Sequence, residues 1–167
     1  MLKLIGLLCI VMCGAAAGIE ASSRLKGRAE YCRKTSMLLR ETASIMRFSC
    51  EPLPELINEL AYRSGFMQLG FIQTAAGCME EGVFFPDAWQ RGIDEDSKIT
   101  PELRVILEPL GESLGASDIE GQLMTLGRTE EQLQELYRMT QEQYTRKGRL
   151  YRCLGILGGM SAALLIC

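Results

Sequence analysis

The sequence contains no histidine, and this absence excludes several classes of chemistry. Ser-His-Asp and Cys-His mechanisms need an imidazole base, and histidine is also the commonest metal ligand in proteins. We also expect no phosphate-binding glycine loop and no nucleophile elbow. The sequence therefore predicts that this protein is not an enzyme and has no catalytic, metal-binding or cofactor-binding residues.

A large excess of either charge is also lacking, because 18 basic residues stand against 21 acidic ones, for a net charge of -3. A protein that binds nucleic acid usually carries a strong positive balance on one face. We therefore expect no nucleic acid among the partners. The 167 residues include only five prolines and no repeat or low-complexity tract, which is typical of a single domain.

The seven cysteines lack the spacing of a metal site or a disulfide framework. No two of them form a CxxC pair, their number is odd, and four lie in the apolar ends of the chain. A free cysteine packs like a small hydrophobic side chain. We therefore expect buried thiols in a reducing compartment. The cysteines are Cys9, Cys13, Cys32, Cys50, Cys78, Cys153 and Cys167.

The N-terminal end is the longer of two apolar ends. Residues 4–19 contain no charged or strongly polar side chain. A bilayer core about 30 Å thick requires around 20 helical residues. With its flanking residues included, and with Lys3 reaching one interface, this end predicts a transmembrane helix over residues 1–21. A short basic start and the small residues 14–17 also fit a cleaved secretory signal, so that alternative stays open.

Residues 150–167 form the second apolar end. The uncharged part, residues 153–167, gives only about 22 Å of helix, which is short for a membrane span. Its glycines, alanines and serine favour close helix packing within a membrane. We predict a second transmembrane helix here, with a buried core helix as the alternative.

Basic residues gather on the inner side of both apolar ends. An excess of lysine and arginine marks the cytoplasmic side of a membrane segment. The middle region is therefore predicted to be cytoplasmic, in a protein that crosses the cell membrane twice. The basic residues are Arg24, Lys26, Arg28, Arg33 and Lys34 after the first end, and Arg146, Lys147, Arg149 and Arg152 around the start of the second.

The middle region, residues 22–149, is helix-compatible throughout and shows no strand-like alternation. Apolar residues recur at steps of three and four, and Pro52, Pro54, Pro86 and Pro101 mark breaks or helix starts. The fold class predicted is all-α: a cytoplasmic helical bundle of about six helices flanked by N- and C-terminal transmembrane helices. Helices are expected over residues 24–50, 55–63, 66–79, a short stretch from 86, 101–110 and 117–149.

Several local signals predict where these helices begin and end. Thr100 is expected to cap the helix that follows it, and Ser117 and Glu120 have the spacing of a capping box. Residues 111–117 are expected to form a turn that depends on its glycines. The acidic residues 92–98 are expected to form a solvated connection.

Five segments of the sequence together resemble the stage III sporulation protein AB family. They are residues 1–6 (MLKLIG), 51–56 (EPLPEL), 87–89 (DAW), 110–123 (LGESLGASDIEGQL) and 154–159 (LGILGG). The resemblance follows the order and length of nearly the whole chain, and the fourth segment is its most specific part. It implies a role in the complex that connects mother cell and forespore in endospore-forming bacteria.

The resemblance further implies a function and partners. Members of this family look like the cytoplasmic F-type platform domain of type II secretion and type IV pilus machines, which lies beside a hexameric ATPase. By that analogy, the chain is a non-catalytic membrane platform on the mother-cell side that couples the sporulation AA-type ATPase to the membrane assembly. Its partners are then this ATPase, other membrane components of the channel and the membrane, with oligomer formation left open.

Two alternative functions stay open. One is a platform fragment of a general secretion or pilus system, and the other is an exported helical protein held by a membrane anchor. Full platform proteins carry a duplicated cytoplasmic domain, and this chain has no repeat, which favours the sporulation role over the first alternative.

A small set of residues is expected either to dock a partner or to define the architecture. They lie in the short helix from residue 86 and around the turn at 111–120. A tryptophan here is more typical of a core anchor than of a binding hot spot. The candidate residues are Trp89, Gly111, Glu112, Gly115, Asp118 and Glu120.

Overall fold

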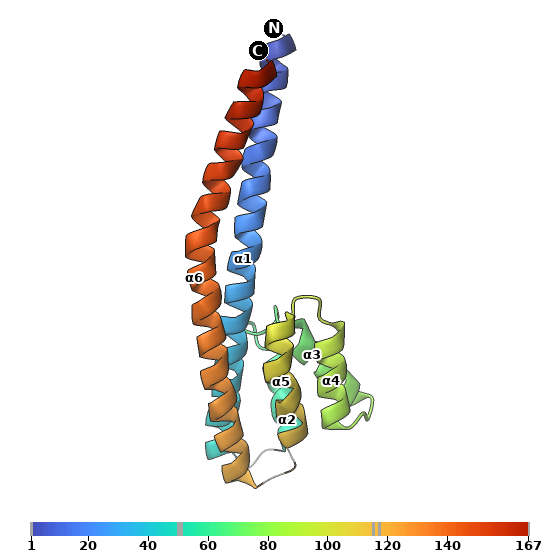
Figure 1. Ribbon diagram of the computed structural model, residues 1–167. Helices are drawn as coiled ribbons and strands as arrows, with labels where there is room; N and C mark the ends of the chain where they lie inside the picture. Colours follow the sequence, from blue (N-terminus) through green and yellow to red (C-terminus); the bar gives the residue numbers. More distant parts are fainter. Residues whose placement is uncertain (1, 50–51, 115, 117, 167) are drawn as a thin grey trace. The chain divides into compact units, whose positions relative to one another are not determined.

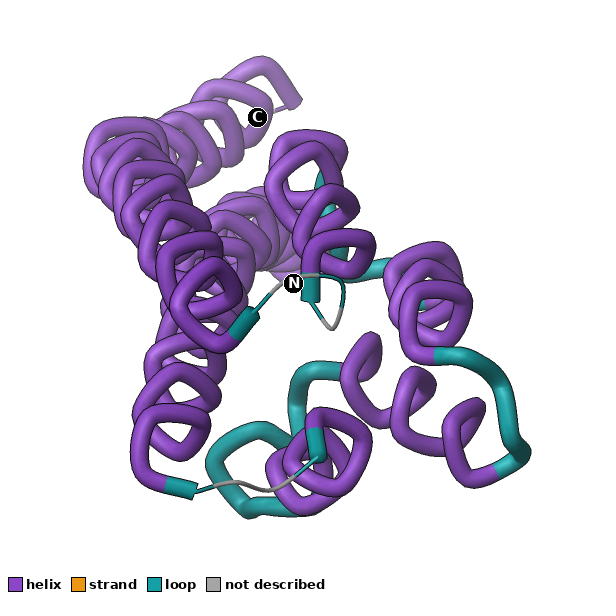
Figure 2. Tube along the Cα trace, turned by 90° about the horizontal axis from the view of Figure 1, so that it is seen from below, coloured by secondary structure: helices purple, strands orange, loops and turns teal. Residues whose placement is uncertain are grey.

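A computed structural model describes residues 2–49, 52–114, 116 and 118–166 of the chain. Within these ranges, the side chains of residues 2–11, 13–15, 17, 18, 21 and 147–166 are not described. Every regular element in the described residues is a helix (Figure 2). The predicted all-α class is therefore confirmed for the part of the chain that the structure describes.

Six helices make up the described chain, labelled in order in Figure 1. The prediction placed two further helices beside a bundle of about six, and it was wrong on this point. The two ends are instead the first and last parts of α1 and α6, because no proline interrupts either stretch. The helices are α1 (Leu2–Phe48), α2 (Leu53–Ala61), α3 (Gly70–Glu80), α4 (Phe85–Glu95), α5 (Pro101–Ser113) and α6 (Ile119–Ile166).

The chain divides into two compact units, one of residues 1–29 with 138–167 and one of residues 30–137. Among the described residues, none of the helices has a stretch with the length and apolar character that a membrane crossing requires. Most side chains of the predicted segment 1–21, and all of those in 150–167, lie outside the description. The predicted domain boundaries after residues 21 and 149 stay predictions.

The unit of residues 30–137 contains a hydrophobic core to which all six helices contribute. Helix α3 packs against α2 and α4, and α4 packs against α5. Helix α1 buries the side chains of Tyr31, Cys32, Leu38 and Leu39. The largest fully buried side chains include Trp89, Phe71, Leu38, Leu56, Ile57, Leu60, Leu69, Ile72, Ile93, Leu103 and Leu107.

The start of α5 follows from local sequence as predicted, and a glycine ends α3. The Thr100 side chain accepts a hydrogen bond from the Leu103 backbone N–H at 3.3 Å, which caps α5. Just after the C-terminal end of α3, Gly82 has a φ of 86°, a conformation that favours glycine. The backbone N–H groups of Gly82 and Val83 donate to the carbonyls of Met79 and Cys78, which is a Schellman motif.

The start of α3 depends instead on a carboxylate from a distant part of the chain. Asp96 Oδ2 accepts the backbone N–H of Phe71 at 2.9 Å and the hydroxyl of Tyr31 at 2.5 Å. Its other oxygen accepts the backbone N–H of Lys98 at 2.9 Å. The prediction of a helix from residue 66 was therefore wrong by four residues, because a tertiary contact supplies the cap.

The acidic connection predicted over residues 92–98 is largely helical. Helix α4 continues to Glu95, and only the residues from Asp96 onward connect it to α5. Gly92 lies within this helix, where a Cβ atom would lie 2.2 Å from the backbone carbonyl oxygen of Phe71. The glycine therefore lets α4 lie directly against the backbone of α3.

Replacing Gly92 with alanine is expected to force α3 and α4 apart. We predict that Gly92→Ala lowers the free energy of unfolding by about 1–3 kcal/mol, because the obstructing atom is backbone and cannot rotate away. Gly77→Ala in α3 is the matched control, since a Cβ there meets nothing within 4 Å. That control should instead raise the free energy of unfolding, by about 0.5–1 kcal/mol. Urea unfolding of the full chain in detergent measures both, and equal effects would contradict the close approach.

Candidate functional site

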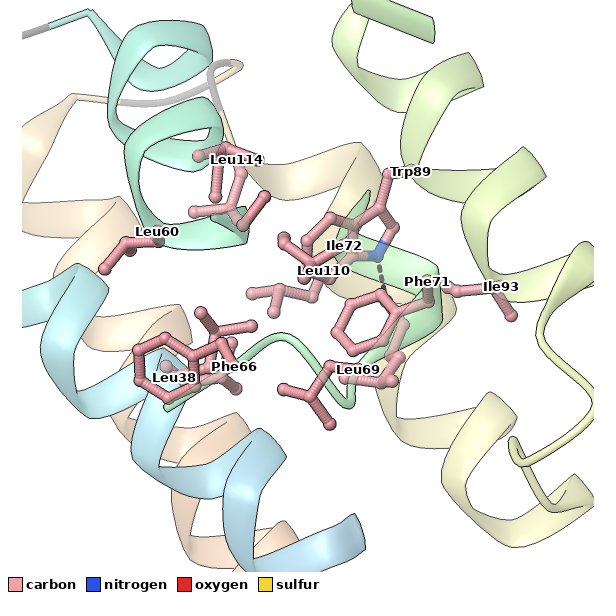
Figure 3. Packing of buried hydrophobic residues seen from close by; sticks show 14 of the residues in the cluster. Leu38, Leu60, Phe66, Leu69, Phe71, Ile72, Trp89, Ile93, Leu110 and Leu114 are labelled. Atoms are coloured by element: carbon pink, nitrogen blue, oxygen red, sulfur yellow. Dashed lines mark hydrogen bonds between the residues drawn. The ribbon is translucent and has the colours of Figure 1, made fainter. Parts of the chain in front are cut away.

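The candidate residue Trp89 lies at the centre of the core rather than at the surface. Its side chain is only 1% exposed. The ring meets Phe71 edge-on, with centroids 5.3 Å apart, and Phe85 at 5.6 Å. Its indole Nε1–H donates to the Leu107 carbonyl of α5 at 2.9 Å (Figure 3). A buried indole needs such an acceptor, so this hydrogen bond fixes both the ring and the spacing of α4 and α5.

Gly111 lies directly against this indole. A Cβ atom at residue 111 would lie 2.3 Å from Trp89 Cδ1 and 2.9 Å from Cγ. The sequence interpretation assigned Gly111 to a turn, and this was wrong: it is a buried residue within α5, which continues to Ser113. Its role is to leave room for the tryptophan. Of the five candidate residues that the structure describes, it brings Trp89 and Gly111 into contact and no others.

The other candidates lie apart from this pair. Glu112 is exposed on α5, and Glu120 is exposed in the first turn of α6. Asp118 caps α6, because its Oδ1 accepts the Gly121 backbone N–H at 3.0 Å. Gly115 and Ser117, the first residue of the predicted capping box, lie outside the described residues. The structure therefore presents Glu112 and Glu120 as charged surface residues with no architectural role in the described contacts.

The prediction of no nucleophile elbow overlooked the GxSxG spacing of residues 111–115. That motif works only on a strand-to-helix turn with a histidine partner. Here Ser113 is the last residue of α5, and its hydroxyl donates to the Leu110 carbonyl at 3.1 Å. Residues 111–113 of this spacing form the end of a helix, and no strand precedes them among the described residues.

A polar network covers the outer edge between α4 and α5. The Arg104 guanidinium pairs with Asp94 and with Glu108, the second at 3.2 Å. Gln90 adds a hydrogen bond to Glu108 at 3.2 Å. The hydrogen bond from Arg104 lowers the pKa of the Asp94 carboxyl. Exposed pairs of this kind contribute little to stability, so the network mainly gives this edge a fixed pattern of charge.

Two buried titratable groups on α1 are neutral at physiological pH. Burial raises the pKa of the Cys32 thiol to about 11, which disfavours the reactive thiolate form. Burial, and then the hydrogen bond to Asp96, raise the pKa of the Tyr31 hydroxyl above its ordinary value. Among the described residues, no group of three metal-ligating side chains gathers.

Comparison with known families gives one match. The family model described as stage III sporulation protein AB matches residues 3–167. No curated protein and no solved structure matches the chain. The match covers four of the five segments that carried the resemblance and residues 3–6 of the first, and it confirms that resemblance.

A double-mutant cycle tests the contact between the tryptophan and the glycine. Trp89→Ala should lower the free energy of unfolding by about 3–5 kcal/mol, and Gly111→Ala by about 1–3 kcal/mol. Because the alanine methyl finds space once the indole is gone, the double variant should lose less than the sum, by about 0.5–3 kcal/mol.

The control for this cycle is Gly127→Ala, since a Cβ at residue 127 meets nothing within 4 Å. Its effect should add to that of Trp89→Ala. Strict additivity of Trp89→Ala and Gly111→Ala would contradict the contact.

Proposed function

This chain belongs to the stage III sporulation protein AB family, and from that premise we propose that it is a non-catalytic membrane platform of the channel complex between mother cell and forespore. In this role it couples a cytoplasmic secretion-type ATPase, the sporulation AA-type protein, to the membrane assembly. Family membership places the protein in sporulation. The platform role rests on the chain's own packing and charge pattern.

The observation that carries the proposal is the way α3, α4 and α5 are fixed to one another. A Cβ at residue 92 would collide with the backbone of α3, so α3 and α4 touch directly, and a Cβ at residue 111 would collide with the Trp89 ring, so α4 and α5 enclose that ring with no room for a further atom. The Trp89 hydrogen bond to Leu107 adds a direct link. Closely packed interiors of this kind have low compressibility and transmit strain. A platform that couples an ATPase to the membrane needs this property, because a deformable platform would absorb the movement of the ATPase.

The attachment to the membrane is proposed from the ends of the sequence. Residues 4–19 and 153–167 are uncharged, and basic residues follow the first stretch and precede the second. Of these, Arg24, Lys26, Arg28 and Arg146 are exposed in the structure. We place the charged middle region in the mother-cell cytoplasm by the positive-inside rule. Other membrane components of the channel, and further copies of the chain, are the partners expected within the bilayer.

The surface proposed for the ATPase includes Glu112. This residue is exposed on α5, one position beyond Gly111, and it makes no hydrogen bond or ion pair among the described residues. A charge at such a position steers and aligns a partner without stabilising the fold. Its neighbours on the α4–α5 edge, Arg104 and Glu108, extend the charged pattern.

Binding of the ATPase to the full chain in detergent tests this function. The chain should bind the folded ATPase, and Glu112→Lys should weaken the affinity about tenfold, a change of about 1.4 kcal/mol. Glu131→Lys makes the same charge change on an exposed part of α6 and is the matched control, for which we expect less than a twofold effect.

The outcomes separate the two parts of this proposal. Failure of the unaltered chain to bind a folded ATPase would contradict the coupling role. Binding that Glu112→Lys leaves unchanged would contradict only the proposed surface.

A further inference from the structure

The two compact units of the chain carry opposite charge, although the net charge of the whole sequence is only -3. The unit of residues 1–29 and 138–167 contains nine basic and two acidic side chains, which gives it a net charge of +7. The unit of residues 30–137 contains nine basic and 19 acidic side chains, for a net charge of -10. Charge that is segregated in this way attracts partners of opposite sign to each unit. The first unit therefore suits an anionic partner.

Most of this positive charge lies in one band of the first unit, which we call the basic collar. Residues 24–28 of α1 and residues 146–152 of α6 contribute to it. These stretches are far apart in the sequence, and the fold brings them into one compact unit in which the first part of α1 and the last part of α6 run antiparallel (Figure 1). The collar consists of Arg24, Lys26, Arg28, Arg146, Lys147, Arg149 and Arg152.

Three side chains of the collar are available to a partner from outside. Lys26, Arg28 and Arg146 are exposed, and they make no hydrogen bond or ion pair among the described residues. Insertion of a membrane protein depends on the number of basic residues beside a span, whether or not these residues are paired in the folded state. Exposed and unpaired cations in the folded unit are a separate observation, and they indicate a surface that binds anions.

The two acidic residues of this unit do not neutralise the collar. Glu20 pairs with Arg24 at 3.1 Å, and both side chains are exposed. Glu142 pairs with Arg138, which lies outside the collar, at 2.7 Å. Exposed pairs of this kind contribute little to stability. The unit therefore keeps a large excess of positive charge that its own acids do not compensate.

The helices determine how far the collar lies from the uncharged stretches 4–19 and 153–167. Neither α1 nor α6 is interrupted between its stretch and the collar. At a rise of about 1.5 Å per residue, Arg24 to Arg28 lie about 8–14 Å beyond the first stretch, and Arg146 lies about 10 Å before the second. Basic side chains also extend toward an interface. With both stretches in a bilayer core, the charges of both helices lie within about 10 Å, one Debye length, of the lipid head groups.

This common depth favours a lipid surface over a soluble anion. A single phosphate needs donors that converge on one point, whereas the collar charges are spread around two helices at one level. Tyr151 lies two residues before the uncharged stretch of α6, and tyrosine is enriched where a helix leaves the bilayer core. A band of separate cations at this level matches a layer of separate head groups.

We propose that the basic collar binds the head groups of anionic phospholipids in the membrane that holds the chain. This inference rests on the proposed membrane attachment and adds the class of lipid to it. Each basic residue close to an anionic membrane surface strengthens binding about fivefold. The unit of residues 30–137 has the opposite charge, so it does not compete with the collar for these lipids.

The lipid that the full chain retains tests the proposal. The chain is equilibrated in detergent micelles with equal amounts of anionic phosphatidylglycerol and zwitterionic phosphatidylcholine, and mass spectrometry counts the lipids that remain after purification. Phosphatidylglycerol should exceed phosphatidylcholine about tenfold at low salt. Because salt screens exposed charges, this excess should fall severalfold in 0.5 M NaCl. Equal retention of the two lipids at low salt would overturn the proposal.

A triple variant locates the lipid contact in the collar. Lys26→Gln, Arg28→Gln and Arg146→Gln together remove the three exposed and unpaired charges, and the excess of phosphatidylglycerol should fall at least fivefold. The control makes the same charge change at three exposed arginines of the other unit and should alter the excess less than twofold. Equal losses in the two variants would mean attraction to the net charge alone and would overturn the proposal. The control variant is Arg47→Gln with Arg91→Gln and Arg128→Gln.

Flotation with vesicles of phosphatidylcholine alone separates this inference from the proposed attachment. A chain that floats with these vesicles but retains both lipids equally is attached without lipid selectivity, which would overturn the inference alone. A chain that does not float with them would overturn the attachment and the inference together. The inference would also fail if the collar variant dissociated a dimer of the chain and left the lipid excess unchanged, because the acidic unit of a second copy would then be the partner of the collar.

Discussion

The indole of Trp89 joins three helices of the core at one point. Its faces and edges contact Phe71 of α3 and Phe85 at the start of its own helix, and its N–H bonds to Leu107 of α5. Gly111 leaves the space in which the ring lies. A larger residue at 111, or a smaller one at 89, would change the distance between α4 and α5. The geometry of the α4–α5 surface, and with it the arrangement of Arg104 and Glu108, depends on this ring.

Local patterns in the sequence were sufficient to predict the fold class and the positions of several helix ends. The steps of three and four among apolar residues, the Thr100 cap and the glycine after α3 act within one turn of helix, so they can be recognised without tertiary structure. The breaks at Pro52 and Pro86 are also local, and each lies at the start of a helix in the structure.

The errors have a shared physical cause, which is that a distant contact overrides a local preference. Asp96 is acidic and follows two other acidic residues, so solvation was the natural expectation, yet it caps α3 across 25 residues of sequence. Glycine normally weakens a helix, yet Gly92 and Gly111 lie inside helices because a neighbour occupies the place of their side chains. In α6, the apolar Ile119 is 55% exposed, whereas the polar Gln122 and Thr129 are buried. Whether such a residue is buried depends on the side chains that pack around it in the folded protein.

The candidate site could be predicted only in part for the same reason. The tryptophan was recognisable as a core anchor from its chemistry, but its partner glycine was not, because 22 residues separate them.

The rigid core and the charged surface of this protein have different roles. The buried contacts of α3, α4 and α5 hold the shape, and Glu112, the residue proposed to contact the ATPase, is exposed and makes no hydrogen bond or ion pair among the described residues. Hydrogen exchange at the Trp89 indole N–H tests the central claim most directly. If this ring holds the core together, its N–H should exchange only when the unit unfolds, with a protection free energy equal to the free energy of unfolding from urea titration. Rapid exchange of the indole N–H while the backbone amides of α3 and α5 stay protected would contradict the account.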